Sequence, residues 1–447
     1  MDQHLIDILG KIFMAGLAAV DPEAAVRRHV ELVGERLRVG ERFYPLDRYR
    51  RIIVTGAGKG TAPMARALED ILGERLTTGW IIVKYGHSLP LKKISVREAG
   101  HPVPDQAGLD ATRFILAEME KCTAEDLVLC AFSGGGSALT PAPRPPLSLW
   151  EKQQTTQLLL DSGASIDEVN AVRKHLSLGK GGQWARLAYP ATVIALLLSD
   201  VVGDSLDVIA SGPTAADPST FADCLAIIGR YGLAAKLPAA VVKMLHAGAD
   251  ALLEETPKAG DAVFKKVHNL VVGSNRAALL AAAHEARSLG YNVLILSSFM
   301  AGEAREIARV LTGIGKEIVL SDNPVPAPAC ILAGGETTVK VRGRGKGGRN
   351  QELALAGALD LKDWSHIALL SAGTDGTDGP TDAAGALVDG DTCRQAWQRG
   401  LNPAAYLENN DSYNFFDRLG QLFKTGPTRT NVMDLMCLLV DKRSSHW

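Results

Sequence analysis

The chain has 447 residues, of which 46% are hydrophobic and 22% are charged, and its formal net charge is -2 at pH 7. This length indicates two or three domains with well-filled cores. The near-neutral charge and the lack of a long basic run argue against a nucleic-acid-binding protein. A small anionic substrate must therefore be bound by local positive groups.

The N-terminus has an acid at position 2 and a helical pattern, unlike a basic leader with a cleavage site. Apolar runs such as "ATVIALLL" are far shorter than the roughly 20 residues that a membrane span requires. The six cysteines include no CxxC pair and lie mostly in apolar surroundings, so we expect buried, reduced thiols. We expect a soluble, cytoplasmic monomer or homodimer that contacts neither membrane nor nucleic acid.

Residues 3–40 are predicted to form two helices. Asp21 is placed as the N-cap of the second helix, with Pro22 at its first position. Short apolar runs then alternate with helical segments, namely "RIIVTG", "GWIIVKYG", "DLVLCAFSGGG" and "ATVIALLLSD". Such runs predict a parallel sheet that is covered on both faces. Between them, Ser165 and Glu168 have the spacing of a capping box.

A domain boundary is predicted between residues 233 and 268, where a polar stretch rich in proline and glycine occupies 254–261. The first α/β domain is placed at 1–240 and the second at 262–405. The second begins with an apparently self-contained strand–helix–strand unit, "NLVVGSNRAALLAAAHEARSLGYNVLILSS". We expect the C-terminal tail, from about 405 to 447, to pack back on the first domain.

Glycine-rich stretches follow or flank predicted strands at 56–60, 133–137, 199–213, 343–348 and 373–379. Open α/β sheets bind ligands at the carboxyl ends of their strands. These five loops are therefore the candidate site.

The loop in "VTGAGKGTAPMARALE" could serve a phosphate or a dinucleotide. A dinucleotide fingerprint needs glycine where Thr61 stands, and an acid near the end of the next strand, where Lys84 stands. The P-loop order is also absent. The loop, including Gly58, and the helix that follows then favour an anion, and Lys59 adds a charge able to follow a phosphate. A tight turn with an exposed lysine is the alternative.

The stretch "AFSGGGSALTPAP" places Ser133, Gly135 and Ser137 at a strand end. It is no nucleophile elbow, because Leu139 stands where the motif needs glycine. A backbone nest for phosphate or carboxylate is the functional interpretation, and a plain glycine turn is the alternative.

The remaining glycine-rich loops carry acidic and basic side chains. Asp200, Asp204 and Asp207 could hold Mg²⁺ or supply a general base, or they could be solvated turn acids. Glu336 follows a buried-type strand. Four basic residues precede a helix that begins near Asn350, and they could bind an anion or form a basic surface loop. The basic residues are Arg342, Arg344, Lys346 and Arg349, and the acids Asp375, Asp378 and Asp382 follow in the next loop.

Lysine, arginine and carboxylate groups at strand ends are what phosphoryl transfer needs, because the charge on the moving phosphate must be offset and the attacking hydroxyl aligned. Nine ordered motifs resemble the glycerate 2-kinases of the MOFRL type, a class once labelled hydroxypyruvate reductases. The motifs are "GAGKGTAPMA", "AGHPVPD", "FSGGGSAL", "SDVVGDSLDVIASGPT", "GGETTV", "GKGGRNQE", "AGTDGTDGPTDAAGA", "NDSYNFF" and "TGPTRTNV".

This resemblance implies phosphorylation of D-glycerate by ATP with Mg²⁺, giving 2-phosphoglycerate. It also implies a larger Rossmann-like N-terminal domain, a smaller α/β domain of the MOFRL type, and an active site in the cleft between them. Lys59 and Arg349 would be the main catalytic cations. Arg429 stands where the family motif is expected to have glycine.

The expected site residues fall into three groups. Lys59, Arg349, Asp204 and Asp375 are expected to be catalytic. Gly58, Ser133, Gly135, Ser137, Glu336, Asn350 and Asn431 are expected to bind substrate or nucleotide. Asp204 and Glu336 are also expected to hold the metal.

The sequence leaves open which carboxylate is the base, and which nucleotide and enantiomer are preferred. The alternatives are an NAD(P)H-dependent reductase of hydroxypyruvate or tartronate semialdehyde, and a ligand-sensing regulator without turnover. The reductase shares the strand-end loops but lacks the dinucleotide fingerprint.

Overall fold

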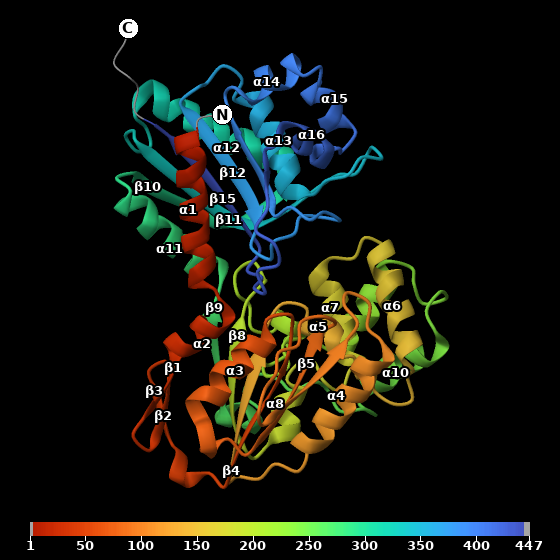
Figure 1. The fold of residues 1–447 in the computed structure, drawn as a ribbon. Coiled ribbons are helices and arrows are strands. Elements are labelled where there is room, and N and C mark those ends of the chain that lie inside the picture. The colour runs from red at the N-terminus through yellow and green to blue at the C-terminus, as the bar shows by residue number, and fades with distance from the viewer. Residues whose placement is uncertain (1–2, 442–447) are drawn as a thin grey trace. The chain divides into compact units, whose positions relative to one another are not determined.

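The computed structural model describes residues 3–441 and divides into two compact units (Figure 1). The central unit comprises Pro22–Val272. The terminal unit comprises the residues up to Asp21 together with those from Gly273 onward. None of the helices in residues 3–441 is long and apolar enough to span a membrane. All six cysteines are buried and form no disulfide, as the sequence predicts.

The central unit is built on a six-stranded sheet. Its strands run in the order β6 (Ile94–Ala99), β5 (Thr78–Lys84), β4 (Arg51–Ala57), β7 (Asp126–Phe132), β8 (Thr192–Leu198) and β9 (Val267–Gly273). The strand pairings from β6 to β8 are all parallel. Numbered from β4, this is the 3-2-1-4-5-6 order of the Rossmann-like doubly wound fold, in which ligands bind where the order reverses. That switch point lies between β4 and β7.

Helices connect and cover these strands. They are α2 (Pro22–His29), α3 (Thr61–Leu72), α4 (Gln106–Met119), α5 (Gly136–Leu139), α6 (Leu149–Asp161), α7 (Ile166–His175), α8 (Gln183–Ala188), α9 (Phe221–Arg230) and α10 (Ala239–Ala249). Each residue of β7 is buried, as its continuous apolar run predicts. The predicted capping box of Ser165 and Glu168 is confirmed at the start of α7.

The prediction of two helices over residues 3–40 is only partly correct. The second helix does begin at Pro22, but it ends at His29 and is followed by a small antiparallel sheet. Its strands are β1 (Val30–Val33), β2 (Arg36–Val39) and β3 (Arg42–Pro45). Gly34 has a φ of +59° in the two-residue turn between β1 and β2, a position that favours glycine in tight hairpins. The hairpin pairing overrides the helical pattern of "VELVGERL".

The terminal unit contains a second, mixed sheet. Its strand order is β10 (Asn292–Glu303), β11 (Ala329–Thr338), β15 (Asp434–Val440), β12 (Ile367–Gly373), β13 (Gly385–Asp389) and β14 (Leu422–Phe423). Within the described residues, β10 and β11 pair in parallel and the other pairings of this sheet are antiparallel. Its helices are α1 (Gln3–Ala19), α11 (Asn275–Ser288), α12 (Ala304–Ser321), α13 (Arg349–Asp360), α14 (Thr392–Gln398), α15 (Pro403–Glu408) and α16 (Ser412–Leu419).

The division of the chain differs from the expected boundaries at three points. The strand–helix–strand unit after 262 is not self-contained, because β9 joins the central sheet and β10 joins the terminal one. The tail does not pack back on the first domain, since β15 pairs with β11 and β12 in the middle of the terminal sheet. Helix α1 also belongs to the terminal unit, where Gly16 lies against Ala278 of α11.

The start of α13 is capped by a side chain from another loop. The carboxylate of Asp378 accepts the backbone N–H groups of Asn350 (3.1 Å) and Gln351 (2.8 Å). The position before the helix is Gly348, and a Cβ there would lie 2.3 Å from the Asp378 carboxyl carbon. Burial raises the pKa of Asp378 to about 6, and Asp434 adds to the increase, although the two backbone hydrogen bonds oppose it.

This raised pKa predicts a pH-dependent stability. Between pH 4 and 6 the folded protein keeps the Asp378 proton that the unfolded chain loses, so the free energy of unfolding should fall as pH rises, by at most about 3 kcal/mol. Asp378→Asn removes that titration. Urea unfolding with EDTA should show the variant gaining stability relative to wild type between pH 4.5 and 7.

Asp382→Asn is the matched control. Hydrogen bonds from Tyr413 and Lys424 lower the pKa of Asp382 to about 2, so its effect should not change between pH 5 and 7. Parallel stability curves for wild type and Asp378→Asn across this range would contradict the assignment.

Arg429 adopts a φ of +62°, a conformation that glycine adopts readily and other residues do not. The side chain is exposed. We expect Arg429→Gly to raise the free energy of unfolding by up to ~1 kcal/mol, a gain reduced by the added freedom of the unfolded chain. Arg429→Ala keeps the backbone strain and is the control. If the glycine variant is no more stable than the alanine variant in urea unfolding, the strain is absent.

Candidate functional site

Two of the predicted glycine loops form one structure at the switch point of the central sheet. The N–H of Gly60 donates to Ser133 Oγ (2.9 Å), and the N–H of Lys59 donates to the Gly134 carbonyl (2.9 Å). Gly58 has a φ of +148°, and a Cβ there would lie 2.1 Å from Ser133 Oγ. Any side chain at 58 would therefore push the two loops apart.

The backbone of the loop after β4 does not cradle an anion in the way the sequence suggested. Its N–H groups from Gly58 to Thr61 all donate to protein acceptors. Within residues 3–441, the N–H groups of Gly134 and Gly135 in the loop after β7 have no such acceptor. The backbone nest that the sequence predicts is therefore available only after β7, while the loop after β4 positions Lys59.

Ser133 is only 2% exposed. Besides accepting the Gly60 N–H, its hydroxyl lies 3.3 Å from Thr61 Oγ1. These contacts hold the two loops together and keep the hydroxyl away from the solvent. Its expected role in binding substrate or nucleotide is better described as positioning the loop.

Lys59 lies in a positively charged environment. A Cβ on Gly135 would meet the His101 ring at 2.8 Å and Lys59 Cγ at 3.5 Å, so both side chains lie against this bare glycine. Burial lowers the pKa of His101 to about 4, and Lys59, Lys84 and His87 lower it further. The imidazole is therefore neutral at pH 7. The edge of the sheet carries the positive potential that an anionic ligand needs.

A second group of cations lies beside Ser137. Its Oγ accepts hydrogen bonds from Arg173 Nη2 (2.7 Å) and Lys180 Nζ (3.0 Å). Both side chains, together with Lys152, line a cavity of about 350 Å³. Ser137 was predicted from the sequence, but the three cations were not. Nothing in the helical pattern of α6 and α7 shows which lysines and arginines are buried.

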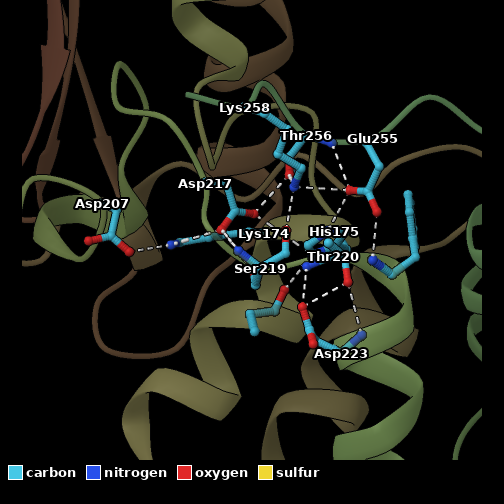
Figure 2. Close-up of polar contacts among 12 residues, drawn as sticks. Lys174, His175, Asp207, Asp217, Ser219, Thr220, Asp223, Glu255, Thr256 and Lys258 are labelled. Atoms are coloured by element: carbon cyan, nitrogen blue, oxygen red, sulfur yellow. Dashed lines mark hydrogen bonds and ion pairs between the residues drawn. The ribbon is translucent and has the colours of Figure 1, made fainter. Parts of the chain in front are cut away.

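The acids at 199–213 follow the end of β8. Figure 2 shows Asp207 and Asp217 on either side of Lys174, at 3.0 and 3.3 Å from Nζ. In the same network His175 Nε2 lies 2.9 Å from Glu255 Oε2. The network anchors the end of α7 and occupies Asp207. Asp204 is partly exposed with a φ of +55°, and its catalytic and metal-binding roles stay predictions.

The terminal unit holds Arg349 in a rigid carboxylate frame. Its Nε and Nη2 donate to the two oxygens of Asp434 (2.6 and 3.0 Å), and its Nη1 lies 2.8 Å from Glu336 Oε1. Asp434 is buried at the start of β15 and also accepts Asn350 Nδ2 (2.9 Å). A bidentate pair of this kind fixes the guanidinium plane.

Asn350 supports this frame from within the core. It is 1% exposed, and its Oδ1 accepts the Ser371 hydroxyl (2.7 Å). Its expected role in ligand binding therefore becomes one of positioning Asp434. Asp434 itself was not predicted from the sequence. The available signal was a lone acid at the entry to the apolar run "LMCLLV", directly after the "TGPTRTNV" motif.

More than one carboxylate lies around the single positive charge of Arg349. Desolvation raises the pKa of Glu336, and Asp434 and Asp375 raise it further, although Arg349 opposes them. Desolvation acts to lower the pKa of Arg349, but Asp434 and Glu336 hold it above its ordinary value. A divalent cation would relieve this excess of negative charge.

The donor chemistry of this acidic edge fits Mg²⁺. Glu336 has 47% of its side chain exposed, and Asp375 is partly exposed at the end of β12. In the part of the chain that the structure describes, no three His, Cys, Asp or Glu residues are grouped to hold a metal unaided. Mg²⁺ commonly takes one or two carboxylates and completes its shell with phosphate oxygens and water.

The "TGPTRTNV" segment lies beside the Asp375 loop. Thr428 Oγ1 donates to the Thr374 carbonyl (2.6 Å), and the Thr374 N–H donates to the Met433 carbonyl (2.9 Å). Asn431 Oδ1 accepts the Met433 N–H (3.1 Å) and shapes this turn. The structure thus brings Arg349, Asn350, Glu336, Asp375 and the Asn431 segment to one edge of the terminal sheet.

Known proteins resemble the chain over nearly its whole length. Residues 8–246 match the domain family described as a domain of unknown function (DUF4147), and residues 329–434 match the MOFRL family. The D-glycerate 2-kinase of Thermotoga maritima is 43% identical over 427 residues, covering 94% of this chain and 99% of the relative. A protein of Agrobacterium vitis that carries a provisional hydroxypyruvate reductase name is 42% identical, covering 97% of this chain and 94% of that relative.

The solved structures agree with the sequence comparison. A crystal structure of a glycerate kinase from Thermotoga maritima superposes with a TM-score of 0.87 at 41% identity, covering 98% of this chain and all of the other. With its DUF4147 and MOFRL domains in the same chain, the protein belongs to the glycerate 2-kinase family of the MOFRL type.

Proposed function

We propose that this protein transfers the γ-phosphoryl group of ATP to the 2-hydroxyl of D-glycerate, with Mg²⁺, and produces 2-phosphoglycerate and ADP. The observation that carries the proposal is the placement of Lys59 against the bare loop after β7, at the switch point of a sheet whose dinucleotide determinants are missing. The names of the relatives support the same substrate.

In the proposed reaction, the C2 oxygen of glycerate forms a bond to the γ-phosphorus while the bond from that phosphorus to the β–γ bridging oxygen breaks. Lys59 and Arg349 would offset the charge that spreads over the equatorial oxygens. The free N–H groups of Gly134 and Gly135 would add hydrogen bonds to an anionic oxygen. Asp375 or Asp204 would orient the hydroxyl and accept its proton.

Mg²⁺, when bound, would neutralise phosphate charge, with Glu336 as one ligand and, where Asp204 is the base, Asp375 as a second. Asp434 would not be a ligand, because Arg349 and Asn350 already occupy its oxygens. It would instead act as a positioning residue that aims the Arg349 guanidinium.

The structure gives one further reason to prefer a kinase to a reductase. Thr61, which replaces the last glycine of a dinucleotide loop, is fully buried at the start of α3, and its hydroxyl donates to the Ala131 carbonyl (3.3 Å). Lys84 occupies the end of β5, where a ribose-binding acid would be needed.

Phosphorus NMR of the purified protein with D-glycerate, ATP and Mg²⁺ tests the proposed function. We expect a new phosphomonoester resonance coupled to a single proton, because the phosphate would be on C2. Coupling to two protons would move the phosphate to C3 and contradict the regiochemistry. Absence of transfer, with NADH consumed on hydroxypyruvate, would replace the kinase by a reductase.

Lys59→Met tests the role assigned to the loop after β4. Removing the charge at similar side-chain volume should lower kcat on the order of 10²–10³-fold, by analogy with other preorganised charge contacts. Lys121→Met is the control, since Lys121 is an exposed surface residue that pairs with Glu118. A Lys59→Met enzyme with nearly unchanged kcat in a coupled ADP-release assay would remove Lys59 from the mechanism.

A further inference from the structure

The cavity beside Ser137 combines apolar walls with a cationic floor. It has a volume of about 350 Å³, and Leu149, Leu160 and the 102–104 segment contribute to its walls. Lys152 from α6, Arg173 from α7 and Lys180 beyond α7 form the floor. All of these residues belong to the central unit. Three cations around a space of this size are unusual in a protein interior.

Lys152 is the most unusual of the three. It is 6% exposed, and its Nζ is buried without a hydrogen-bond partner. Among the described residues, neither Lys152 nor Arg173 nor Lys180 forms an ion pair. Lys174, next to Arg173 in the chain, is by contrast neutralised by Asp207 and Asp217. A buried cation without a partner carries a large desolvation cost.

Hydrogen bonds to Ser137 hold the other two cations, Arg173 and Lys180, in position. Because Ser137 Oγ accepts from both Arg173 and Lys180, its own proton is available to Ser211 Oγ (2.8 Å). Ser211 in turn donates to Asn170 Oδ1 (3.3 Å). Lys180 Nζ also donates to the Ser137 carbonyl (2.7 Å). All of these acceptors are neutral, so the positive charge of the floor stays uncompensated.

The pKa values of the two lysines in the floor are lowered by burial and by the neighbouring positive charges. Desolvation lowers the pKa of Lys152 to about 7, with Arg173 adding to the decrease. Desolvation also lowers the pKa of Lys180 far below its ordinary value, and Lys152 and Arg173 contribute. Among the described residues, no carboxylate acts on Lys152 or Lys180. An anionic ligand would raise both pKa values and take up protons.

We propose that this pocket binds the carboxylate of the hydroxy-acid acceptor, with Lys152 as the main counter-ion and Arg173 and Lys180 beside it. The inference rests on the proposed function and names the substrate contact that the reaction needs. Ser137 of the pocket is two residues from Gly135, which contacts Lys59, and two residues span at most about 7 Å. A three-carbon acid held by its carboxylate therefore reaches from the floor toward Lys59.

The cavity favours a small carboxylate over a nucleotide. The apolar walls suit a short carbon chain, and the planar guanidinium of Arg173 matches the geometry of a carboxylate. The triphosphate is then left to Lys59 and the free N–H groups after β7.

Lys152→Met is the informative variant, because it removes a buried charge that holds no other group in place. We expect it to fold at least as stably as wild type. Calorimetric titration of D-glycerate, with and without a non-hydrolysable ATP analogue, should show at least tenfold weaker binding than in wild type. In steady state the KM for glycerate should rise at least tenfold, while the KM for ATP stays within twofold.

Two further experiments identify the chemical group that the pocket binds. At pH 8, wild type should take up protons on binding glycerate, seen as heats that depend on the ionisation enthalpy of the buffer, and Lys152→Met should lose this uptake. Glycerol, which lacks the carboxylate, should not bind, and Lys121→Met should behave as wild type.

Unchanged glycerate affinity in Lys152→Met, or no glycerate binding to wild type in either titration, would overturn the inference. If Lys152→Met no longer binds inorganic phosphate but still binds glycerate, the inference would be overturned in favour of a phosphate pocket. The two proposals fail separately. Glycerate binding that depends on Lys152 without phosphoryl transfer would reject the kinase alone, and transfer that is insensitive to Lys152 would reject the pocket alone.

Discussion

The strands β4 and β7 approach so closely near the end of β4 that only glycine fits at positions 56 and 58. A Cβ on Gly56 would lie 1.9 Å from the Ala131 carbonyl, and one on Gly58 would lie 2.1 Å from Ser133 Oγ. Where the loops after β4 and β7 pack together, the N–H groups of the loop after β4 donate hydrogen bonds to the protein, whereas those of Gly134 and Gly135 stay available. It also sets Lys59 against Gly135 and directs Ser137 to the cationic pocket. The glycines are therefore required by packing, and the chemistry follows from the packing.

The two units present opposite electrostatic environments at the edges of their sheets. The central unit gathers Lys59, Lys84 and the cations around Ser137. Burial, together with the charges of Lys59 and Lys84, lowers the pKa of His101 and keeps its ring neutral. The terminal unit surrounds Arg349 with carboxylates, and burial together with Asp434 and Asp375 raises the pKa of Glu336. Phosphoryl transfer from a metal–nucleotide complex needs both environments, cations for the anionic groups and oxygen ligands for the metal.

The sequence predicted the features that depend on local pattern. The strands of the central sheet follow from continuous apolar runs, and the capping box of Ser165 follows from its spacing. The catalytic roles of Lys59 and Arg349 were predicted from the resemblance of their loops to motifs of the glycerate 2-kinase family, and they stay predictions.

Features that depend on long-range contacts were not predictable. The β1–β2 hairpin overrides a helical pattern, and β15 enters the middle of a sheet whose neighbours lie far away in the chain. Asp434 holds Arg349 and Lys152 is an unpaired cation because both side chains are buried, and a single sequence does not show burial. The hydrogen bonds that Ser133 and Asn350 make within the protein could not be read from the sequence either.

The central claim is that Lys59 and the loop after β7 receive the phosphate that is transferred. A crystal structure with D-glycerate, Mg²⁺ and a non-hydrolysable ATP analogue tests it most directly. The account predicts γ-phosphate oxygens within hydrogen-bond distance of Lys59 Nζ. An analogue whose γ-phosphate lies away from Lys59 and from the Gly134 and Gly135 N–H groups would contradict it.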